Sequence, residues 1–226
     1  MTETEQLMPY EDMLQAGMHF GRKKTVFNPM MKKYVFTVRD GICIIDLLQT
    51  QTELQEAVKY LKTIIDKKGI ILFASLTKQS VDGIKDLAEA LGMPYVLERW
   101  LGGTLTNFKE LNSRVKKMEE MERQKAQGEL DKYTKKERTM FDKDLAKIQK
   151  RFGGLRKLVR IPDVLFVSSL KEGALPVREA KRMGIKVVSV CNTDANPEDV
   201  DFAIPANDRS KRSVDLILEI LKKELK

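Results

Sequence analysis

A Gly-Gly pair followed by Thr and Asn is one feature of this 226-residue chain with the chemistry to bind an anion. It lies in ERWLGGTLTNFKEL, residues 98–111, directly before a stretch that can form a helix. Backbone N–H groups at a helix N-terminus bind phosphate. The segment lacks the Gly-Lys-Ser/Thr of a P-loop and the three spaced glycines of a dinucleotide-binding turn. A simple turn, with the helix N-cap at Thr104 or Thr106, is the alternative interpretation.

A second candidate is the basic and aromatic segment GMHFGRKKTVFNPMMKKYVF, residues 17–36. Residues 18–39 contain six Lys or Arg and no Asp or Glu. Cationic side chains neutralise phosphates, and aromatic rings stack on unpaired bases. The aromatic residues serve equally well as anchors to a core, and His19 suits a structural role or an RNA contact. The pattern favours a nucleic-acid-binding surface.

The positive charge of the chain is concentrated in one region. The net charge is +8, and residues 101–160 alone hold 17 Lys or Arg against 9 Asp or Glu, the same excess of eight. Charge that is so localised indicates a binding surface for an acidic partner. Solvated helix faces are the alternative, which suits residues 110–150 better than residues 18–39.

Few residues suit catalysis or metal binding. The chain has one His, which argues against a multi-His metal site, and no nucleophile–base pair stands out. We therefore predict no enzyme activity, cofactor, metal ion or small-molecule substrate. Cys43 and Cys191 lie in apolar runs and are expected to be buried thiols. No run approaches the roughly 18 apolar residues of a membrane span, and the polar N-terminus lacks a signal-peptide pattern, so we expect a cytoplasmic protein without a membrane partner.

Strand-like and helix-like segments alternate along most of the chain. Asp40-Gly41 between two apolar runs predicts a β-hairpin. Thr50–Glu53, TQTE, has the pattern of a capping box at the start of a helix. The other predicted strands are residues 70–74, 95–97, 163–169, 186–190 and 201–205, and the predicted helices are residues 10–17, 50–68, 79–91, 174–184 and 213–225. This alternation predicts an α/β domain around a mostly parallel sheet.

Residues 104–152 interrupt the alternation. They contain two narrow apolar stripes, a spacing typical of coiled coils. The stripes are Phe108, Leu111, Val115 and Met118, then Phe141, Leu145, Ile148 and Phe152. A polar break at Gly128 and a capping box at Thr134–Glu137 separate them. The pattern predicts an antiparallel coiled-coil hairpin, residues 104–152, inserted into a discontinuous α/β domain, residues 1–103 and 153–226. Packing of both helices into the main core is the alternative.

Several longer motifs occur in an order and spacing that carry a resemblance. They are AGMHFGRKKTVFNPMMKKYVF, DGICIIDLLQT, RWLGGTLTNF, PDVLFV and VREAKRMGIKVVSVCNTDANPEDVDFAIPAND. Together they cover nearly the whole chain, and it resembles the bacterial-type ribosomal protein S-two family. The resemblance implies a flavodoxin-like or Rossmann-like α/β fold, with a mostly parallel sheet, helices on both faces and an inserted coiled-coil hairpin. It also implies a structural constituent of the small ribosomal subunit, near the junction of head and body.

The resemblance implies partners as well. They are small-subunit ribosomal RNA and neighbouring small-subunit ribosomal proteins, with a role in subunit assembly and translation and in docking the mRNA-binding protein S-one. Trp100 is expected to pack at the base of the hairpin. The predicted RNA-binding residues are Arg22, Lys23, Lys24, Asn28, Lys32, Lys33, Arg99, Thr104, Thr106 and Asn107, with His19, Lys109 and Arg114 as further candidates. Two other classes stay open: a nucleotide-using enzyme on a doubly wound sheet, and a coiled-coil adaptor with incidental positive charge.

Overall fold

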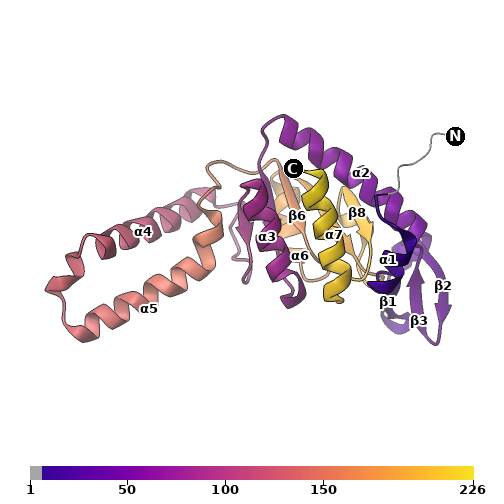
Figure 1. Ribbon diagram of the computed structural model, residues 1–226, viewed down its shortest axis with the longest axis horizontal. Helices are drawn as coiled ribbons and strands as arrows, with labels where there is room; N and C mark the ends of the chain where they lie inside the picture. Colours follow the sequence, from indigo (N-terminus) through magenta and orange to yellow (C-terminus); the bar gives the residue numbers. More distant parts are fainter. Residues whose placement is uncertain (1–6) are drawn as a thin grey trace.

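Five parallel strands in the order β5-β4-β6-β7-β8 form the central sheet (Figure 1). The structure, a computed structural model, describes residues 7–226 apart from the side chains of residues 129 and 131. The strands are β4 (Ile71–Ala74), β5 (Tyr95–Val96), β6 (Val164–Val167), β7 (Lys186–Cys191) and β8 (Phe202–Pro205). The predicted α/β fold with a parallel sheet is confirmed. The expectation drawn from the polar N-terminus falls on residues 1–6, outside the described part.

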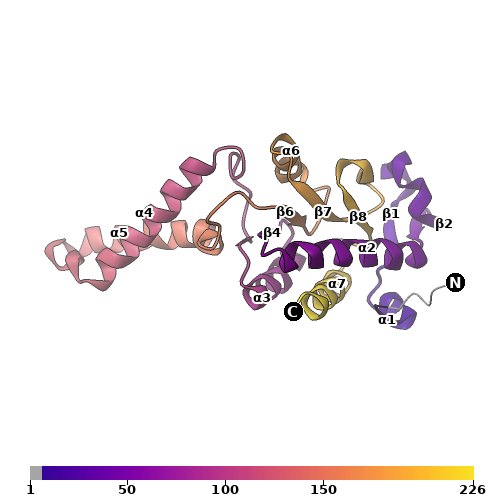
Figure 2. The same ribbon diagram turned by 90° about the horizontal axis from the view of Figure 1, so that it is seen from above.

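Helices cover both faces of this sheet, because side chains of the strands alternate between two apolar cores. In β4, Ile71 and Phe73 join one core, whereas Leu72 and Ala74 join the other, and all four are fully buried. Figure 2 shows α3 and α7 on one side of the sheet and α6 on the other. The helices of the first core are α1 (Tyr10–Gln15), α2 (Leu47–Asp66), α3 (Val81–Leu91) and α7 (Lys211–Glu224). The second core contains α6 (Ala174–Arg182) and buried side chains of two long helices, α4 (Phe108–Ala126) and α5 (Lys135–Phe152).

Helix α2 begins earlier than the sequence predicts. Asp46 is its N-cap, and Asp46 Oδ1 accepts a hydrogen bond from the backbone N–H of Leu48 at 2.9 Å. Thr50 is fully buried inside the helix, where its hydroxyl donates to the carbonyl of Pro205 at 2.6 Å. The predicted capping box at Thr50 is therefore wrong, and this threonine instead joins α2 to β8.

A small antiparallel sheet carries the basic N-terminal segment. Its strand order is β1-β3-β2, and Asp40 and Gly41 between β2 and β3 have positive φ angles of 51° and 75°. These angles suit a two-residue hairpin turn, so the predicted hairpin is confirmed. Strand β1 was not predicted. The elements are β1 (Phe20–Lys23), the 3-10 helices η1 (Lys24–Val26) and η2 (Pro29–Tyr34), β2 (Val35–Arg39) and β3 (Ile42–Ile45).

Two long helices project away from the central sheet as a hairpin, which we call the arm (Figure 1). They are α4 (Phe108–Ala126) and α5 (Lys135–Phe152), joined through the 3-10 helix η4 (Glu129–Lys132). The predicted apolar stripes face inward, since every stripe residue is buried or half-buried. Lys125 of α4 pairs with Asp142 of α5 at 2.7 Å. The helical hairpin is thus present, and its limits at residues 104 and 152 stay a prediction.

The second predicted capping box is confirmed at the start of α5. The backbone N–H of Glu137 donates to Thr134 Oγ1 at 3.4 Å, and the backbone N–H of Thr134 donates to Glu137 Oε2 at 2.9 Å. These two bonds satisfy N–H groups that would otherwise have no partner within the helix. They restart the helix after the turn of the arm.

Candidate nucleic-acid interface

The Gly-Gly segment surrounds a carboxylate of the protein itself. Glu179 of α6 is buried, and its Oε1 accepts hydrogen bonds from the backbone N–H of Gly103 at 2.9 Å and from Trp100 Nε1 at 3.2 Å. Its Oε2 accepts from the backbone N–H groups of Leu105 at 3.0 Å and Thr106 at 3.4 Å. The amides that suggested a phosphate site are therefore occupied, and the anion beside them is Glu179.

These donors hold Glu179 in its charged form. Burial by itself raises the pKa of Glu179, but the N–H groups of Gly103, Leu105, Trp100 and Thr106 outweigh it and leave the pKa below its ordinary value. A buried carboxylate stays ionised when several hydrogen bonds favour the charged form. The same contacts place Trp100, which is buried, at the base of the arm. Sequence reasoning missed Glu179, because no local pattern links α6 to a loop more than 70 residues away.

The predicted RNA-binding residues of this segment divide into two groups. Thr104 is buried and its hydroxyl donates to a backbone carbonyl at 2.6 Å, while the hydroxyl of Thr106 donates to Glu179 at 3.4 Å. Arg99 and Asn107 are exposed. Both threonine hydroxyls thus have partners within the protein. Thr106 is nevertheless exposed, as are Arg99 and Asn107, so only Thr104 is inaccessible to a partner.

The alternative interpretation of a threonine N-cap is wrong. Helix α4 begins after Asn107, whose side chain makes no capping hydrogen bond. Lys109 and Arg114, the further candidates on α4, are both exposed. Arg114 forms an ion pair with Glu110 one turn earlier at 2.9 Å. An exposed pair of this kind contributes little stability, so Arg114 can exchange this partner for another anion at low cost.

Four predicted lysines of the basic N-terminal segment are exposed, and we refer to them together as the lysine face. They are Lys23, Lys24, Lys32 and Lys33. None of them makes a salt bridge with a described residue. Lys33 Nζ lies 4.6 Å from the centroid of the Tyr34 ring, and Tyr34 is buried. Lys33 therefore presents its charge beside a ring that is part of the core.

Arg22 lies among these lysines in sequence but points into the protein. Its Nε lies 3.6 Å from Asp194 Oδ2 and its Nη2 lies 3.7 Å from Asp208 Oδ1. Asp208 is almost fully buried and accepts a hydrogen bond from the hydroxyl of Ser169 at 2.6 Å. The backbone N–H of Arg22 donates to Thr193 Oγ1 at 2.7 Å. Arg22 thus neutralises two carboxylates of the α/β domain and attaches the small sheet to it.

Asn28 and His19 are half-buried. Asn28 Oδ1 caps η2 by accepting from the backbone N–H of Met30 at 3.0 Å, and the backbone N–H of Asn28 donates to the carbonyl of Thr193 at 2.9 Å. The His19 ring packs on Phe20 with 4.0 Å between ring centroids. Burial lowers the pKa of His19, which favours the neutral imidazole at pH 7. Both residues therefore have structural contacts whatever else they bind.

The cysteines, the possible metal ligands and the apolar character of the helices bear on thiol, metal and membrane sites. Cys43 and Cys191 are free, buried thiols, as the sequence predicts, and burial raises the pKa of each. Among residues 7–226, no group of three or more His, Cys, Asp or Glu is arranged to hold a metal ion. Over the same residues, no helix has both the length and the apolar composition to cross a membrane.

Comparison with known proteins identifies the family. The family model for Ribosomal protein S2 matches residues 13–226. The chain is 42% identical over 212 residues to the small ribosomal subunit protein uS2 of Fusobacterium nucleatum, with 93% of this chain and 86% of that protein covered. For uS2 of Thermus thermophilus the identity is 41% over 215 residues, covering 93% and 84%, and for uS2 of Salinibacter ruber it is 37% over 218 residues, covering 96% and 68%. The chain therefore belongs to the ribosomal protein S2 family.

Proposed function

We propose that this protein is a structural constituent of the small ribosomal subunit in the cytoplasm, where it binds small-subunit ribosomal RNA. The observation that carries the proposal is family membership along almost the entire chain, since the match covers residues 13–226. The protein is not an enzyme, because its family and its relatives are ribosomal proteins. This membership removes the support for a nucleotide-using enzyme on the same sheet.

The lysine face is the RNA-binding surface that its charge and exposure support best. Its four ammonium groups have no acidic partner within residues 18–39, which contain no Asp or Glu. Lysines arranged in this way contact phosphates and so position a protein on folded RNA without reading its sequence. Arg99, Asn107 and Lys109 supply a second accessible set at the base of the arm. We assign Arg22 and Thr104 to holding these surfaces in place.

We further propose that neighbouring small-subunit proteins, including S-one, contact the arm at a site near the junction of head and body. The arm extends well beyond the central sheet, and Tyr133 and Met140 in its distal half are more than half exposed. Exposed apolar side chains on a projecting element favour a protein contact. This role is compatible with RNA binding at the lysine face, because the small sheet and the arm lie at opposite ends of the molecule (Figure 1).

Sedimentation of a tagged copy in its own bacterium tests the proposal. We expect the tag in the small-subunit, whole-ribosome and polysome fractions of a sucrose gradient, at the level of other small-subunit proteins. A tag confined to the light fractions would contradict the ribosomal role. Salt then separates RNA binding from an adaptor role: binding through about six phosphates weakens about a thousandfold between roughly 50 and 200 mM salt, whereas an apolar coiled-coil contact persists.

A further inference from the structure

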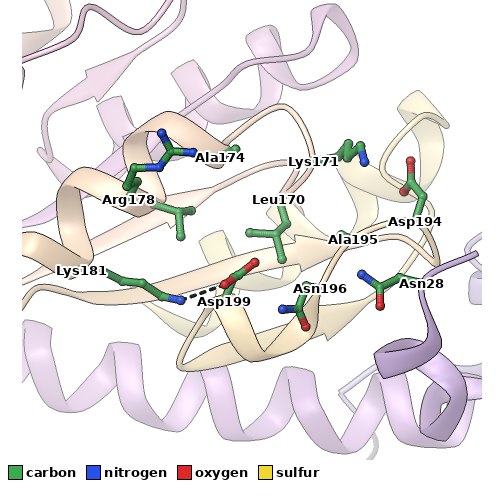
Figure 3. Close-up of a pocket in the computed structure, with 11 residues that line it drawn as sticks. Asn28, Leu170, Lys171, Ala174, Arg178, Lys181, Asp194, Ala195, Asn196 and Asp199 are labelled. Carbon is green, nitrogen blue, oxygen red and sulfur yellow. Dashed lines mark hydrogen bonds and ion pairs between the residues drawn. The ribbon is translucent and has the colours of Figure 1, made fainter.

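A pocket of about 360 Å³ opens beyond the carboxyl ends of β6 and β7, beside α6 (Figure 3). Its wall includes the buried side chain of Leu170, and Asn28 reaches it from the small sheet. In open α/β sheets, ligands bind outside the carboxyl ends of parallel strands. The volume is in the range of sites for small organic groups. The pocket thus has the position and size of a ligand site, and none of the four lysines of the lysine face lines it.

Two asparagines present hydrogen-bond donors to this pocket. Asn28 Oδ1 accepts from the backbone N–H of Met30 at 3.0 Å, and Asn196 Oδ1 accepts from the backbone N–H of Glu198 at 3.2 Å. These bonds determine which atom of each side-chain amide is oxygen, because only oxygen can accept from an N–H. Both side chains line the pocket (Figure 3), and their NH₂ groups make no hydrogen bond with a described residue. Each NH₂ group can therefore donate to a ligand.

Asp194 adds a hydrogen-bond acceptor to the same pocket. Its Oδ1 is fully covered and has no hydrogen-bond partner among the described residues, so a ligand in the pocket does not reach it. The oxygen that the pocket offers is Oδ2, which lies 3.6 Å from Arg22 Nε, beyond hydrogen-bond distance, and can accept from a ligand. Two amide donors beside one carboxylate acceptor complement the edge of a nucleobase that has an exocyclic amino group and ring or carbonyl acceptors.

Two cationic residues flank the pocket. Lys171 and Arg178 are exposed, neither forms a salt bridge with a described residue, and Figure 3 shows them on either side of Leu170. Lys181, also at the pocket, is different, because its Nζ pairs with Asp199 Oδ1 at 3.0 Å. Positive groups on both sides of an apolar surface suit the two phosphates that flank one nucleotide of an RNA chain.

We propose that this pocket binds a single unstacked RNA nucleotide with an amino-bearing base. The base lies against Leu170, its amino group donates to Asp194, and its acceptors receive hydrogen bonds from Asn28 and Asn196. Lys171 and Arg178 neutralise the flanking phosphates. The inference rests on the proposed RNA-binding function and adds base recognition to it, which the lysine face does not provide.

Binding of short RNA to the purified full-length protein tests this proposal. The probes are uridine pentanucleotides in which the central base is adenine, cytosine, guanine or uracil. We expect at least one amino-bearing centre to bind about tenfold more tightly than all-uridine RNA, since each hydrogen bond contributes about 1 kcal/mol. Asn196→Asp should remove that preference while keeping the oxygen that caps the following turn. Arg178→Glu should weaken all four probes, and Arg182→Glu on the same helix is the matched control.

Other results of these measurements would contradict the proposal. Equal affinity for all four probes, or an unchanged preference in Asn196→Asp, would overturn base recognition at this pocket. Equal weakening by Arg178→Glu and Arg182→Glu would show general attraction to a basic surface. A protein that sediments with ribosomes yet lacks the preference would refute the pocket alone, whereas one that stays in the light fractions would refute the proposed function.

Discussion

Arg22 and Lys23 are neighbours in sequence and carry the same charge, yet they have opposite surroundings. Successive side chains of a strand point to opposite faces, so β1 directs Arg22 toward Asp194 and Asp208 and leaves Lys23 exposed. Glu179 is the corresponding case for a negative charge. It accepts hydrogen bonds from the backbone N–H groups of Gly103 and Leu105, so its charge stabilises that loop. At the scale of single residues, the partners of a charged side chain decide whether it stabilises the fold or binds another molecule.

The first prediction concerns Glu179. Replacing it with Gln keeps the shape of the side chain but removes its charge. One carboxylate oxygen becomes an NH₂ group, which then faces the N–H groups that donate to Glu179. We expect Glu179→Gln to lower the free energy of unfolding at pH 7 by about 1–3 kcal/mol. Urea titrations measure this loss, and Glu110→Gln, an exposed carboxylate of α4, is the matched control with little expected effect.

The pH dependence of the difference in stability between wild type and Glu179→Gln gives a sharper test. The pKa of Glu179 is lower in the folded protein than the ordinary value of 4.5, so its charge stabilises the fold above pH 4.5. That stability is lost as the pH falls below 4.5 through the folded-state pKa. The difference between wild type and Glu179→Gln should therefore shrink on acidification. A difference that stays constant down to pH 3 would show that the charge of Glu179 does not stabilise the loop.

At the scale of elements, the sequence predicts segments whose burial follows one pattern and misses those that depend on distant contacts. The run at residues 70–74 has no polar residue, which indicates burial on both faces, and β4 is found there. The TQTE pattern at Thr50 is misleading, because Asp46 caps α2 and tertiary contact with Pro205 buries Thr50. Strand β1 was missed because its four residues, FGRK, are half basic and are held by pairing with β3.

The candidate site likewise combines features that the sequence predicts with contacts that it does not. The charge pattern was sufficient to predict the exposed lysines, since a basic run without acids has no local partner. It could not predict that Gly103 and Leu105 donate to Glu179, because that contact requires α6 to pack under the loop. The sequence therefore indicates which segments matter, whereas the packing decides which atoms of each segment are available.

The second prediction concerns the arm. Among the described side chains of residues 124–143, none is buried, so this distal half adds no fully buried side chain to the core. Replacing these residues with a short Gly-Ser linker should lower the helical circular-dichroism signal and leave the urea midpoint almost unchanged, since the α/β core is intact. A large drop in the midpoint would show that the arm and the α/β domain are one cooperative unit.

On the scale of the whole molecule, the two basic regions are far apart. Figure 1 places the small sheet and the arm at opposite ends of the longest axis. Outside residues 18–39 and 101–160, the rest of the chain has a net charge of −6. A protein with this distribution can contact RNA at one end while the other end contacts a different segment or a protein. Screening at physiological ionic strength limits each region to partners within about 8 Å, so the two act independently.

The third prediction uses that independence. Changing Lys23, Lys24, Lys32 and Lys33 together to Glu should abolish incorporation into the small subunit, because repulsion replaces attraction at every phosphate contact. The fold should survive, since these side chains are exposed and make no salt bridge with a described residue. Sucrose-gradient fractions measure incorporation, and circular dichroism and urea titration verify folding.

A control with the same change in charge separates the lysine face from net charge. Lys67, Lys85, Lys223 and Lys226 are exposed and lie outside both basic regions, so their replacement by Glu should reduce incorporation only slightly. If the folded lysine-face variant enters subunits normally, this surface does not bind ribosomal RNA. If both variants fail equally, long-range attraction by the whole molecule explains assembly better than contacts at one face. Loss confined to the lysine face would make these four side chains the attachment surface, independent of the arm and of the pocket beside α6.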